Sequence, residues 1–488
     1  MIWKRYLPSL LASIAMVAIS VSRAPAQTGS IRQDLPKRTE LGRVGLERQW
    51  FTVIPMTGLN EQLLTIDLHG DLLFAQTNLS NLYVIDPESG RIFWKQNLGI
   101  ERGVMGSTVT LTIPPAVNSM FVFAGSNNTL FCFDKATGRP VWQYTMESGK
   151  SLAIGNRETN TLISSGLAAD EHRVLAGMSA GRLVSLRLLD KKTGKPLAKP
   201  EYEWSWQTND VLSSRPIPAE RVVVFGGRDS KVYVATVADP PQMLLRFKTG
   251  GQVAAPLGAY GTRSIIVPSF DQNVYSVDVF DGNVNWTFSS GAPVDHEPII
   301  AGNDIFVVNV AGALSAINAD TGRARWTRNT GGGQVLAIGR TRLYLQSHDH
   351  DLFIVDRRTG TMVVDSRSSY ERAGLNLREY TVNFTNSVTD RIYLSTPGGT
   401  MVCLREIGES RPMLLRDPNQ PPFGYLPPEK SDSDKAAKKA DDAGAGSADE
   451  KPAAPARPVP KAKAAPKAKA GKAAKKADQE KADDAGAN

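Results

Sequence analysis

The chain has 488 residues, 41% of them hydrophobic, a formal net charge of +8 and two cysteines. At the usual domain size this length would suggest about three domains. Neither cysteine belongs to a Cys-x-x-Cys-His sequence, which excludes c-type haem attachment. A Lys-rich block near the C-terminus biases this charge, so the overall basicity says little about the partners of the rest of the chain.

The N-terminus has the pattern of a secretory signal peptide. Two basic residues precede an apolar stretch at 7–22, and residues 24–26 form a small-x-small cleavage site. Because this stretch is short for a membrane span and contains a proline, we favour a cleaved signal over a retained anchor. We expect a signal peptide at 1–26, an N-terminal extension at 27–43, and a mature protein that is periplasmic or otherwise exported.

From about residue 44 onward a short phrase recurs, in which an apolar strand runs into Asp-x-x-Thr/Ser/Asp-Gly and a Trp follows four residues later. The Asp or Asn side chain can accept a hydrogen bond from a backbone N–H two residues on, and Gly supplies the positive φ of a tight strand connection. The strands ahead of the turns are apolar on both faces, which suits sheets covered on both sides. The complete copies are Asp86, Gly90, Trp94; Asp134, Gly138, Trp142; Asp278, Gly282, Trp286; and Asn318, Gly322, Trp326.

Weaker copies extend the count to eight units. Asp190 to Gly194 and Asp356 to Gly360 repeat the turn; the second has Val at the Trp position, and the first reaches a Trp only after an insertion at Lys191–Glu203. Alignment of the strands adds two further copies that lack the Asp. The anchors then fall at 86, 134, 190, 236, 278, 318, 356 and 405, and their spacing of 38 to 56 residues is typical of β-propeller blades.

We therefore predict an all-β fold, an eight-bladed β-propeller of four-stranded antiparallel blades at 44–410. The last unit lacks its Trp strand, because the chain becomes polar and Pro-rich after Arg405. Residues 46–53 resemble an outer strand without a blade, and we expect them to complete the last unit. Pairing of N- and C-terminal strands would close the ring and leave few exposed edges.

The two cysteines occupy the same strand position in the second and eighth units. Cys132 and Cys403 would then be separated by the first blade, whereas a disulfide needs Cα atoms within about 7 Å of each other. We expect both to be buried as small apolar residues.

The composition changes abruptly after the last unit. Residues 411–430 are predicted to be a Pro-rich linker, and 431–488, without one aromatic residue, a disordered tail. Residues 451–476 carry nine Lys or Arg and no acidic residue, so this block could bind a polyanion or an anionic surface by counterion release. We favour the simpler interpretation, a solvated tether.

The repeat resembles the PQQ-like β-propeller repeat, A-x-D-x-x-T-G-x-x-x-W, of quinoprotein dehydrogenases and the outer-membrane assembly protein BamB. The resemblance covers residues 44–410 and is specific for the fold; it is less specific for function, because the motif packs blades together. We expect its tryptophans to be buried between blades. The chain is more similar to BamB, although no cysteine follows the apolar stretch to carry the lipid anchor that this resemblance implies.

Catalytic signals are weak. Quinoprotein dehydrogenases hold PQQ over a vicinal Cys–Cys disulfide beside a Ca²⁺ site, and this chain has neither adjacent cysteines nor a contiguous match to such a site. The sequence 348–351, His-Asp-His-Asp, is the one metal-like cluster, but the repeat alignment places it in a hairpin loop. Residues 295–297, Asp-His-Glu, also fall in a loop, and His69 and His172 have no evident partner. We predict no catalytic, cofactor or metal site.

The sequence thus favours an exported, monomeric, non-enzymatic propeller that binds envelope proteins as a scaffold, in the manner implied by the resemblance to BamB. No cofactor and no small-molecule substrate are expected. Two alternatives stay open: a PQQ-dependent dehydrogenase, and an envelope protein that binds polyanions through its basic tail.

Overall fold

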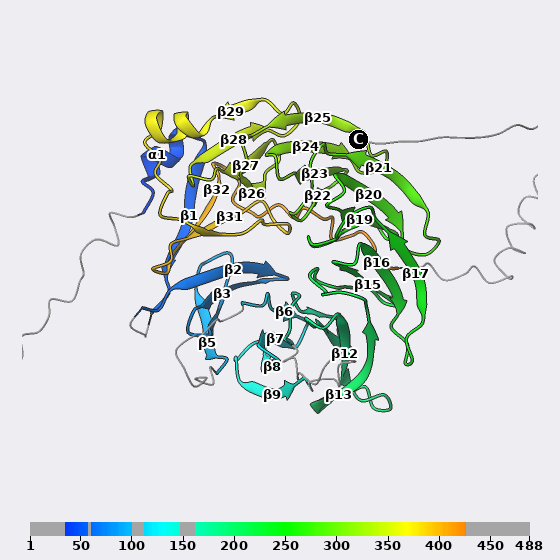
Figure 1. The fold of residues 1–488 in the computed structure, drawn as a ribbon. Helices are drawn as coiled ribbons and strands as arrows, with labels where there is room; N and C mark the ends of the chain where they lie inside the picture. The colour runs from blue at the N-terminus through cyan, green and yellow to red at the C-terminus, as the bar shows by residue number, and fades with distance from the viewer. Residues whose placement is uncertain (1–34, 57–59, 100–111, 147–161, 426–488) are drawn as a thin grey trace, which may run out of the picture. The chain divides into compact units, whose positions relative to one another are not determined.

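The computed structural model describes residues 35–56, 60–99, 112–146 and 162–425. These residues form a closed ring of eight four-stranded antiparallel sheets, which confirms the predicted propeller (Figure 1). The expected signal peptide at 1–26, and the expected tail at 431–488 with its basic block, lie outside the described residues. Within the described part, no helix has the length and apolar character needed to cross a bilayer.

Seven blades are each continuous in sequence, and their strands run in order from the axis of the ring to its rim. Blades 1 to 4 contain β2 (Leu63–His69), β3 (Leu72–Thr77), β4 (Asn81–Ile85), β5 (Ile92–Asn97); β6 (Ala116–Val117), β7 (Phe121–Ser126), β8 (Thr129–Asp134), β9 (Pro140–Thr145); β10 (Ala168–Ala169), β11 (Arg173–Gly177), β12 (Arg182–Leu189), β13 (Pro196–Gln207); and β14 (Ile217–Pro218), β15 (Val222–Gly227), β16 (Lys231–Thr236), β17 (Met243–Lys248). Blades 5 to 7 contain β18 (Gly258–Tyr260), β19 (Ser264–Pro268), β20 (Asn273–Asp278), β21 (Val284–Ser289); β22 (Ile299–Ala301), β23 (Asp304–Val308), β24 (Ala313–Asn318), β25 (Ala324–Asn329); and β26 (Gln334–Ile338), β27 (Arg342–Gln346), β28 (Leu352–Asp356), β29 (Met362–Val364).

Blade 8 is assembled from both ends of the ring. Its strands are β30 (Val382–Asn383), β31 (Ile392–Ser395), β32 (Thr400–Glu406) and, at the rim, β1 (Leu46–Val53). β1 pairs antiparallel with β32, from Leu46 opposite Glu406 to Val53 opposite Thr400. The predicted closure by the N-terminal strand is therefore confirmed.

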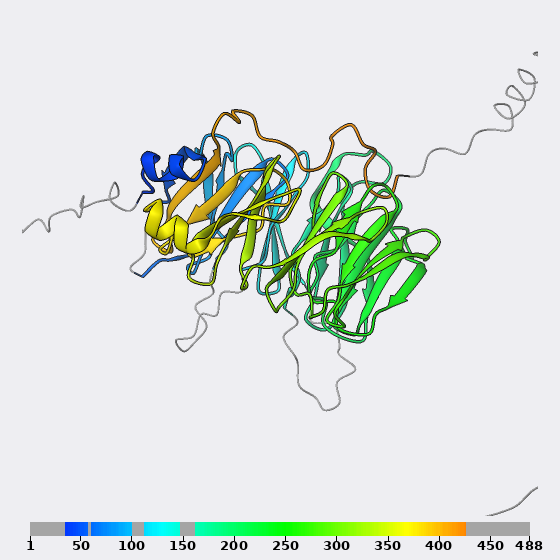
Figure 2. The ribbon, with the colours of Figure 1, turned by 90° about the horizontal axis from the view of Figure 1, so that it is seen from above.

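Two short helices lie side by side near blades 7 and 8 in both views of the ring (Figures 1 and 2). They are α1 (Arg38–Arg43) and a single π-helical turn, η1 (Ser368–Arg372). Leu41 of α1 is buried in one core cluster with Leu375 and Leu377, and the Arg43 guanidinium donates to the Ala373 carbonyl at 3.0 Å. The residues just before β1 are thereby held against the closing blade.

The turns of the repeat owe their shape to the side chain that opens them. Asp134 Oδ1 accepts from the Thr137 backbone N–H at 2.8 Å and from the Thr137 hydroxyl at 2.6 Å. Asp190, Asn318 and Asp356 accept from the Thr three residues on in the same way. These donors lower the pKa of the Asp134, Asp190 and Asp356 carboxyls, because a bonded carboxylate is favoured over the acid.

Three tryptophans of the motif contact the next blade, and each makes the same two contacts. The indole lies over the turn glycine, where a Cβ would stand 2.5 Å from the ring at Gly138, Gly322 and Gly360. Its N–H donates to the carbonyl that follows the opening Asp or Asn. These bonds are Trp94 to Lys135 at 3.0 Å, Trp286 to Ala319 at 2.8 Å and Trp326 to Arg357 at 3.0 Å.

Two tryptophans outside the recognised motif make the same bond. Trp50 of β1 donates to the Pro87 carbonyl at 2.8 Å and lies over Gly90, so it fastens blade 8 to blade 1. Trp204 of β13 donates to the Val237 carbonyl at 3.3 Å. Trp50 precedes the first repeat, and Trp204 is the tryptophan that the third unit reaches only after its insertion.

Blades 2, 4 and 7 depart from this arrangement, and blade 7 has Val364 in place of the Trp. Trp142 packs into the core shared by blades 2 and 3, 5.9 Å from the Phe123 ring, but it does not reach Gly194, which has nothing near its Cβ direction. The β12–β13 hairpin is prolonged, since Leu189 still pairs with Pro196, and this carries the turn away from the blade. In blade 4, Leu245 takes the place of a Trp over Gly282.

The two cysteines and the two His-containing segments lie where the sequence placed them. Cys132 and Cys403 are buried and unpaired, as predicted. His348–Asp351 forms the loop between β27 and β28, and residues 295–297 lie in the connection between β21 and β22, also as predicted.

The contact of an indole with a turn glycine can be tested against a matched glycine. Gly322 and Gly194 both have positive φ, 69° and 64°, but only Gly322 lies under an indole. We expect Gly194→Ala to lower the free energy of unfolding by about 1 kcal/mol, the cost of a left-handed alanine. Gly322→Ala should cost about 1–3 kcal/mol more, because Trp286 must move.

The measurement is the thermal and urea unfolding of both variants beside the parent chain. Equal losses in the two variants would show that the indole contact does not fasten the blades.

Candidate functional site

A cavity of about 940 Å³ follows the axis of the ring. Its wall comes from the innermost strands of blades 1 and 3 to 6, from connections that lead into innermost strands, including that of blade 2, and from Thr385, Ser387 and Val388 of blade 8. In blades 2, 3 and 4 the innermost strand has only two residues, so side chains of the preceding connection contribute much of the wall. None of the repeat positions recognised in the sequence lines this cavity.

One end of the cavity is crossed by the segment that follows β32, residues 407–425, here called the strap (Figure 2). The Leu415 carbonyl accepts from the Gly302 N–H at 3.2 Å, and the Gly424 N–H donates to the Thr262 carbonyl at 2.8 Å. Leu415 is buried in the core of blades 6 and 7, and Phe423 in that of blades 4 and 5. The first part of the predicted 411–430 linker is thus held against the ring.

A charged cluster lies within the cavity wall. Asp67 and His69 alternate along β2, so both side chains face the axis. Arg215, in the connection before β14, reaches them from blade 4. Its Nη2 donates to Asp67 Oδ2 at 3.1 Å and to the Pro115 carbonyl at 3.0 Å, and its Nη1 lies 3.1 Å from His69 Nδ1.

The bond from Arg215 determines the tautomer of His69. A guanidinium only donates, so His69 Nδ1 must accept, and the neutral ring carries its proton on Nε2. Burial, together with the charge of Arg215, lowers the pKa of His69 to about 3. His69 is therefore a neutral donor at physiological pH. The sequence showed no partner for it because Arg215 is 146 residues away.

Glu297 is the second carboxyl of the cluster; it ends the Asp-His-Glu sequence at 295–297 that was expected only as part of a loop. It precedes β22, and burial raises its pKa from 4.5 to about 7; Arg215 and a hydrogen bond from Ser387 oppose this shift, while Asp67 adds to it. Burial also raises the pKa of Asp67, despite its bond to Arg215. One sequence signal could have indicated that Arg215 and Glu297 both face the axis. Arg215-Pro216 and Glu297-Pro298 occupy equivalent positions ahead of innermost strands.

The residues of the cavity do not fit the quinone cofactor of the dehydrogenases. PQQ is a tricarboxylate, but the Nη atoms of Arg215 are committed to Asp67, His69 and a carbonyl, and two carboxyls stand beside them. Cys132 and Cys403 lie in different blades and form no vicinal pair. Among the described residues no group of His, Cys, Asp and Glu could hold a metal ion.

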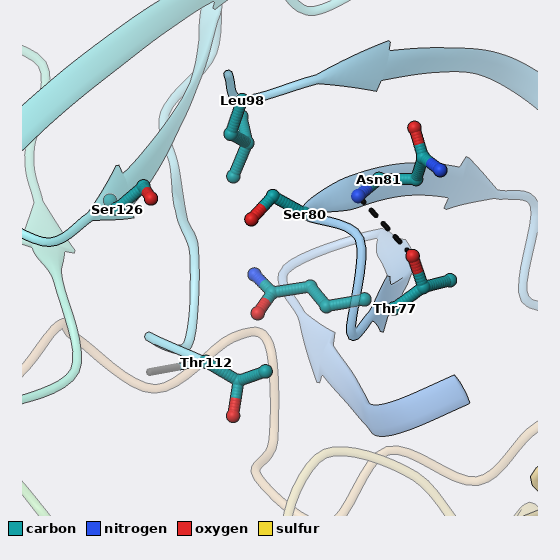
Figure 3. A pocket seen from close by; sticks show the side chains of 8 residues that line it. Thr77, Ser80, Asn81, Leu98, Thr112 and Ser126 are labelled. Atoms are coloured by element: carbon teal, nitrogen blue, oxygen red, sulfur yellow. Dashed lines mark hydrogen bonds between the residues drawn. The ribbon is translucent and has the colours of Figure 1, made fainter. Parts of the chain in front are cut away.

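A second pocket lies between blades 1 and 2 and has a volume of about 10 Å³, which suits a single water molecule (Figure 3). Thr77 and Ser126 are on its wall, and the Asn81 N–H donates to Thr77 Oγ1 at 3.3 Å. Ser80 Oγ is buried there without a hydrogen-bond partner among the described residues. This pocket is too small for a ligand, so the axial cavity is the candidate site.

Comparison with known proteins gave one family. The family model described as outer membrane protein assembly factor BamB matches residues 29–242 and 237–426. Curated relatives of that name come from Shewanella oneidensis, 24% identical over 285 residues (55% of this chain, 69% of the relative), and Yersinia pestis, 22% identical over 279 residues (52% and 65%). The chain thus spans about two thirds of the length of these relatives.

Two solved structures resemble the ring. BamB from Moraxella catarrhalis has a TM-score of 0.54 at 14% identity and covers 72% of this chain and 98% of its own. The computationally designed Ika8 protein has a TM-score of 0.51 at 13% identity, with 73% and 98% covered. At these identities the likeness shows the fold alone.

The raised pKa of Glu297 predicts a pH-dependent stability. Between pH 4.5 and 7 the folded chain keeps a proton on Glu297 that the unfolded chain has lost, so this contribution to stability disappears as the pH rises through 7. The Glu297→Gln variant has no titratable proton at this position, so its stability does not change with pH for this reason. We expect the free energy of unfolding of Glu297→Gln, relative to that of the parent, to increase from pH 5 to pH 8. The increase should be at most about 3 kcal/mol, because water in the cavity screens the charge.

Urea unfolding at pH 5, 6, 7 and 8 measures this difference. Asp295→Asn, which removes an exposed carboxylate two residues away, is the control and should follow the parent. Parallel curves for the parent and Glu297→Gln would contradict the prediction.

Proposed function

The chain belongs to the family of the outer membrane protein assembly factor BamB, and from this premise we propose that it is an exported, non-enzymatic scaffold that holds envelope proteins during outer membrane protein assembly. The observation that carries the proposal is the extent of the family match. It covers residues 29–426, and the described part of that range builds the whole closed ring. The part of the chain shared with the family is therefore a complete structural unit.

The structure of the ring supports a binding role. The conspicuous sequence motif is used for turns and blade contacts, and none of its residues lines the axial cavity. A ring fastened in this way presents its loops on a rigid frame, which reduces the ordering cost of binding a protein. The signal-like N-terminus supports a periplasmic location.

The prolonged hairpin of blade 3 is our candidate for the partner contact. The insertion at Lys191–Glu203 continues β12 and β13 as paired strands, with Arg187 opposite Glu201, and the hairpin projects beyond the rim (Figure 1). Tyr202 on it is 53% exposed. Two prolines in β13 and two register shifts blunt its free edge, so side-chain contacts are favoured over addition of a strand.

The function is tested in the cells that make this protein. Removal of the gene should lower the amount of folded outer membrane β-barrel proteins, measured by heat-modifiable gel mobility, and the full chain should restore it. Unchanged levels after removal would overturn the proposed function.

The contact surface is tested separately. A variant in which Asn-Gly joins Arg187 directly to Glu201 shortens the hairpin with a two-residue turn. It should unfold at the same temperature as the parent yet restore less folded barrel protein. A photo-crosslinking residue at Tyr202 should capture an envelope protein, whereas one at Leu244, 50% exposed on the next blade, should not. Full restoration by the shortened variant would remove the hairpin from the proposal without affecting the function.

A further inference from the structure

The charged cluster of the axial cavity has more acidic groups than cationic ones. Asp67 and Glu297 contribute two carboxyls, Arg215 contributes a guanidinium that is bonded to Asp67 and only acts on Glu297 through its charge, and His69 is neutral. The strap adds one group of each sign, Arg416 and Asp417, at the end of the cavity. The excess of acidic over cationic groups therefore lies at the cluster itself.

The Nη atoms of Arg215 are already bonded to groups of the protein. Its two Nη atoms bond three acceptors on blades 1 and 2. Its side chain also lies against Gly166, where a Cβ would come within 2.9 Å of Nε. The guanidinium is thus fixed from both sides and serves to position Asp67 and His69. An anionic ligand would meet a guanidinium that already bonds a carboxylate, with a second carboxyl beside it.

We propose that the axial cavity binds an alkylammonium group, with Glu297 as the carboxylate that meets it and Asp67 as a further acceptor. An ammonium has three donors and no acceptor, which matches carboxylate oxygens that the guanidinium leaves free. The rest of the wall suits a methylene chain, because it includes Ile113, Ile163, Leu257, Ile300 and Val388. The cavity volume of about 940 Å³ is within the range of small-ligand sites, about 300–1,000 Å³.

Charge compensation supplies the physical reason. A buried carboxylate without a cation is costly, and Glu297 avoids this cost by keeping a proton up to about pH 7. A bound ammonium replaces that proton as the compensating charge. Binding must therefore release a proton below pH 7 and none well above it, so the affinity should rise about tenfold from pH 6 to pH 8.

The inference is independent of the proposed scaffold function, because the cavity and the hairpin lie in different parts of the ring. It departs from the expectation, made from the sequence, that the chain binds no small molecule.

The proposal is tested by calorimetric titration of the full chain with three probes of one chain length: pentylammonium, pentanol and pentanoate. We expect pentylammonium to bind at least tenfold more tightly than pentanol, and pentanoate not to bind.

Two variants locate the site. Glu297→Gln should lose at least tenfold in affinity for pentylammonium and lose the dependence on pH. Asp295→Asn removes an exposed carboxylate, 2.6 Å from His296 and outside the cavity wall, and should keep both. Thermal unfolding of both variants shows that the fold is retained.

Equal affinities for the three probes, no binding of pentylammonium, or unchanged binding by Glu297→Gln would each overturn the proposal. The source of the ammonium is identified with Nα-acetyl-lysinamide as a fourth probe. Tighter binding than pentylammonium points to the lysine side chain of a peptide, and weaker binding to a free amine; both results support recognition of the alkylammonium group.

Discussion

The bond between an indole and the turn of the neighbouring blade is the interaction that recurs around the ring, at five of its eight blade junctions. Each sheet is apolar on both faces and must be covered by the next one, and Trp combines a large apolar area with one N–H that finds a fixed carbonyl. The glycine beneath the ring supplies both the positive φ of the turn and the space for the indole. Trp50 applies this contact between the last blade and the first, so the same chemistry closes the circle.

Closure of the ring creates the axial cavity and decides which residues meet there. Packing between blades constrains the outer strands and the turns, whereas the connections that enter the innermost strands are free to differ. Arg215 and Glu297 occupy equivalent positions in two of these connections, yet one positions a carboxylate and a histidine while the other is a carboxyl whose pKa is raised by burial. The ring thus separates the repeat residues that join the blades from the residues that face the axial cavity.

The two proposals concern different surfaces of one frame. A partner protein would meet the prolonged hairpin at the rim, where blade 3 departs from the common pattern, and an alkylammonium group would meet the cluster on the axis. Both sites are departures from the repeat. The repeated motif forms turns and blade contacts, and both proposed sites use residues outside it.

The sequence by itself determined the all-β propeller, the eight units, the completion of the last blade by residues 46–53 and the burial of Cys132 and Cys403. These features follow from local patterns, namely strand apolarity, turn chemistry and spacing. Only the tertiary structure decided that Trp50 and Trp204 fasten blades, that His69 has a partner, and that Glu297 faces a cavity. The physical reason is distance along the chain: Arg215 and Asp67 are 148 residues apart, and only the closed ring brings them together.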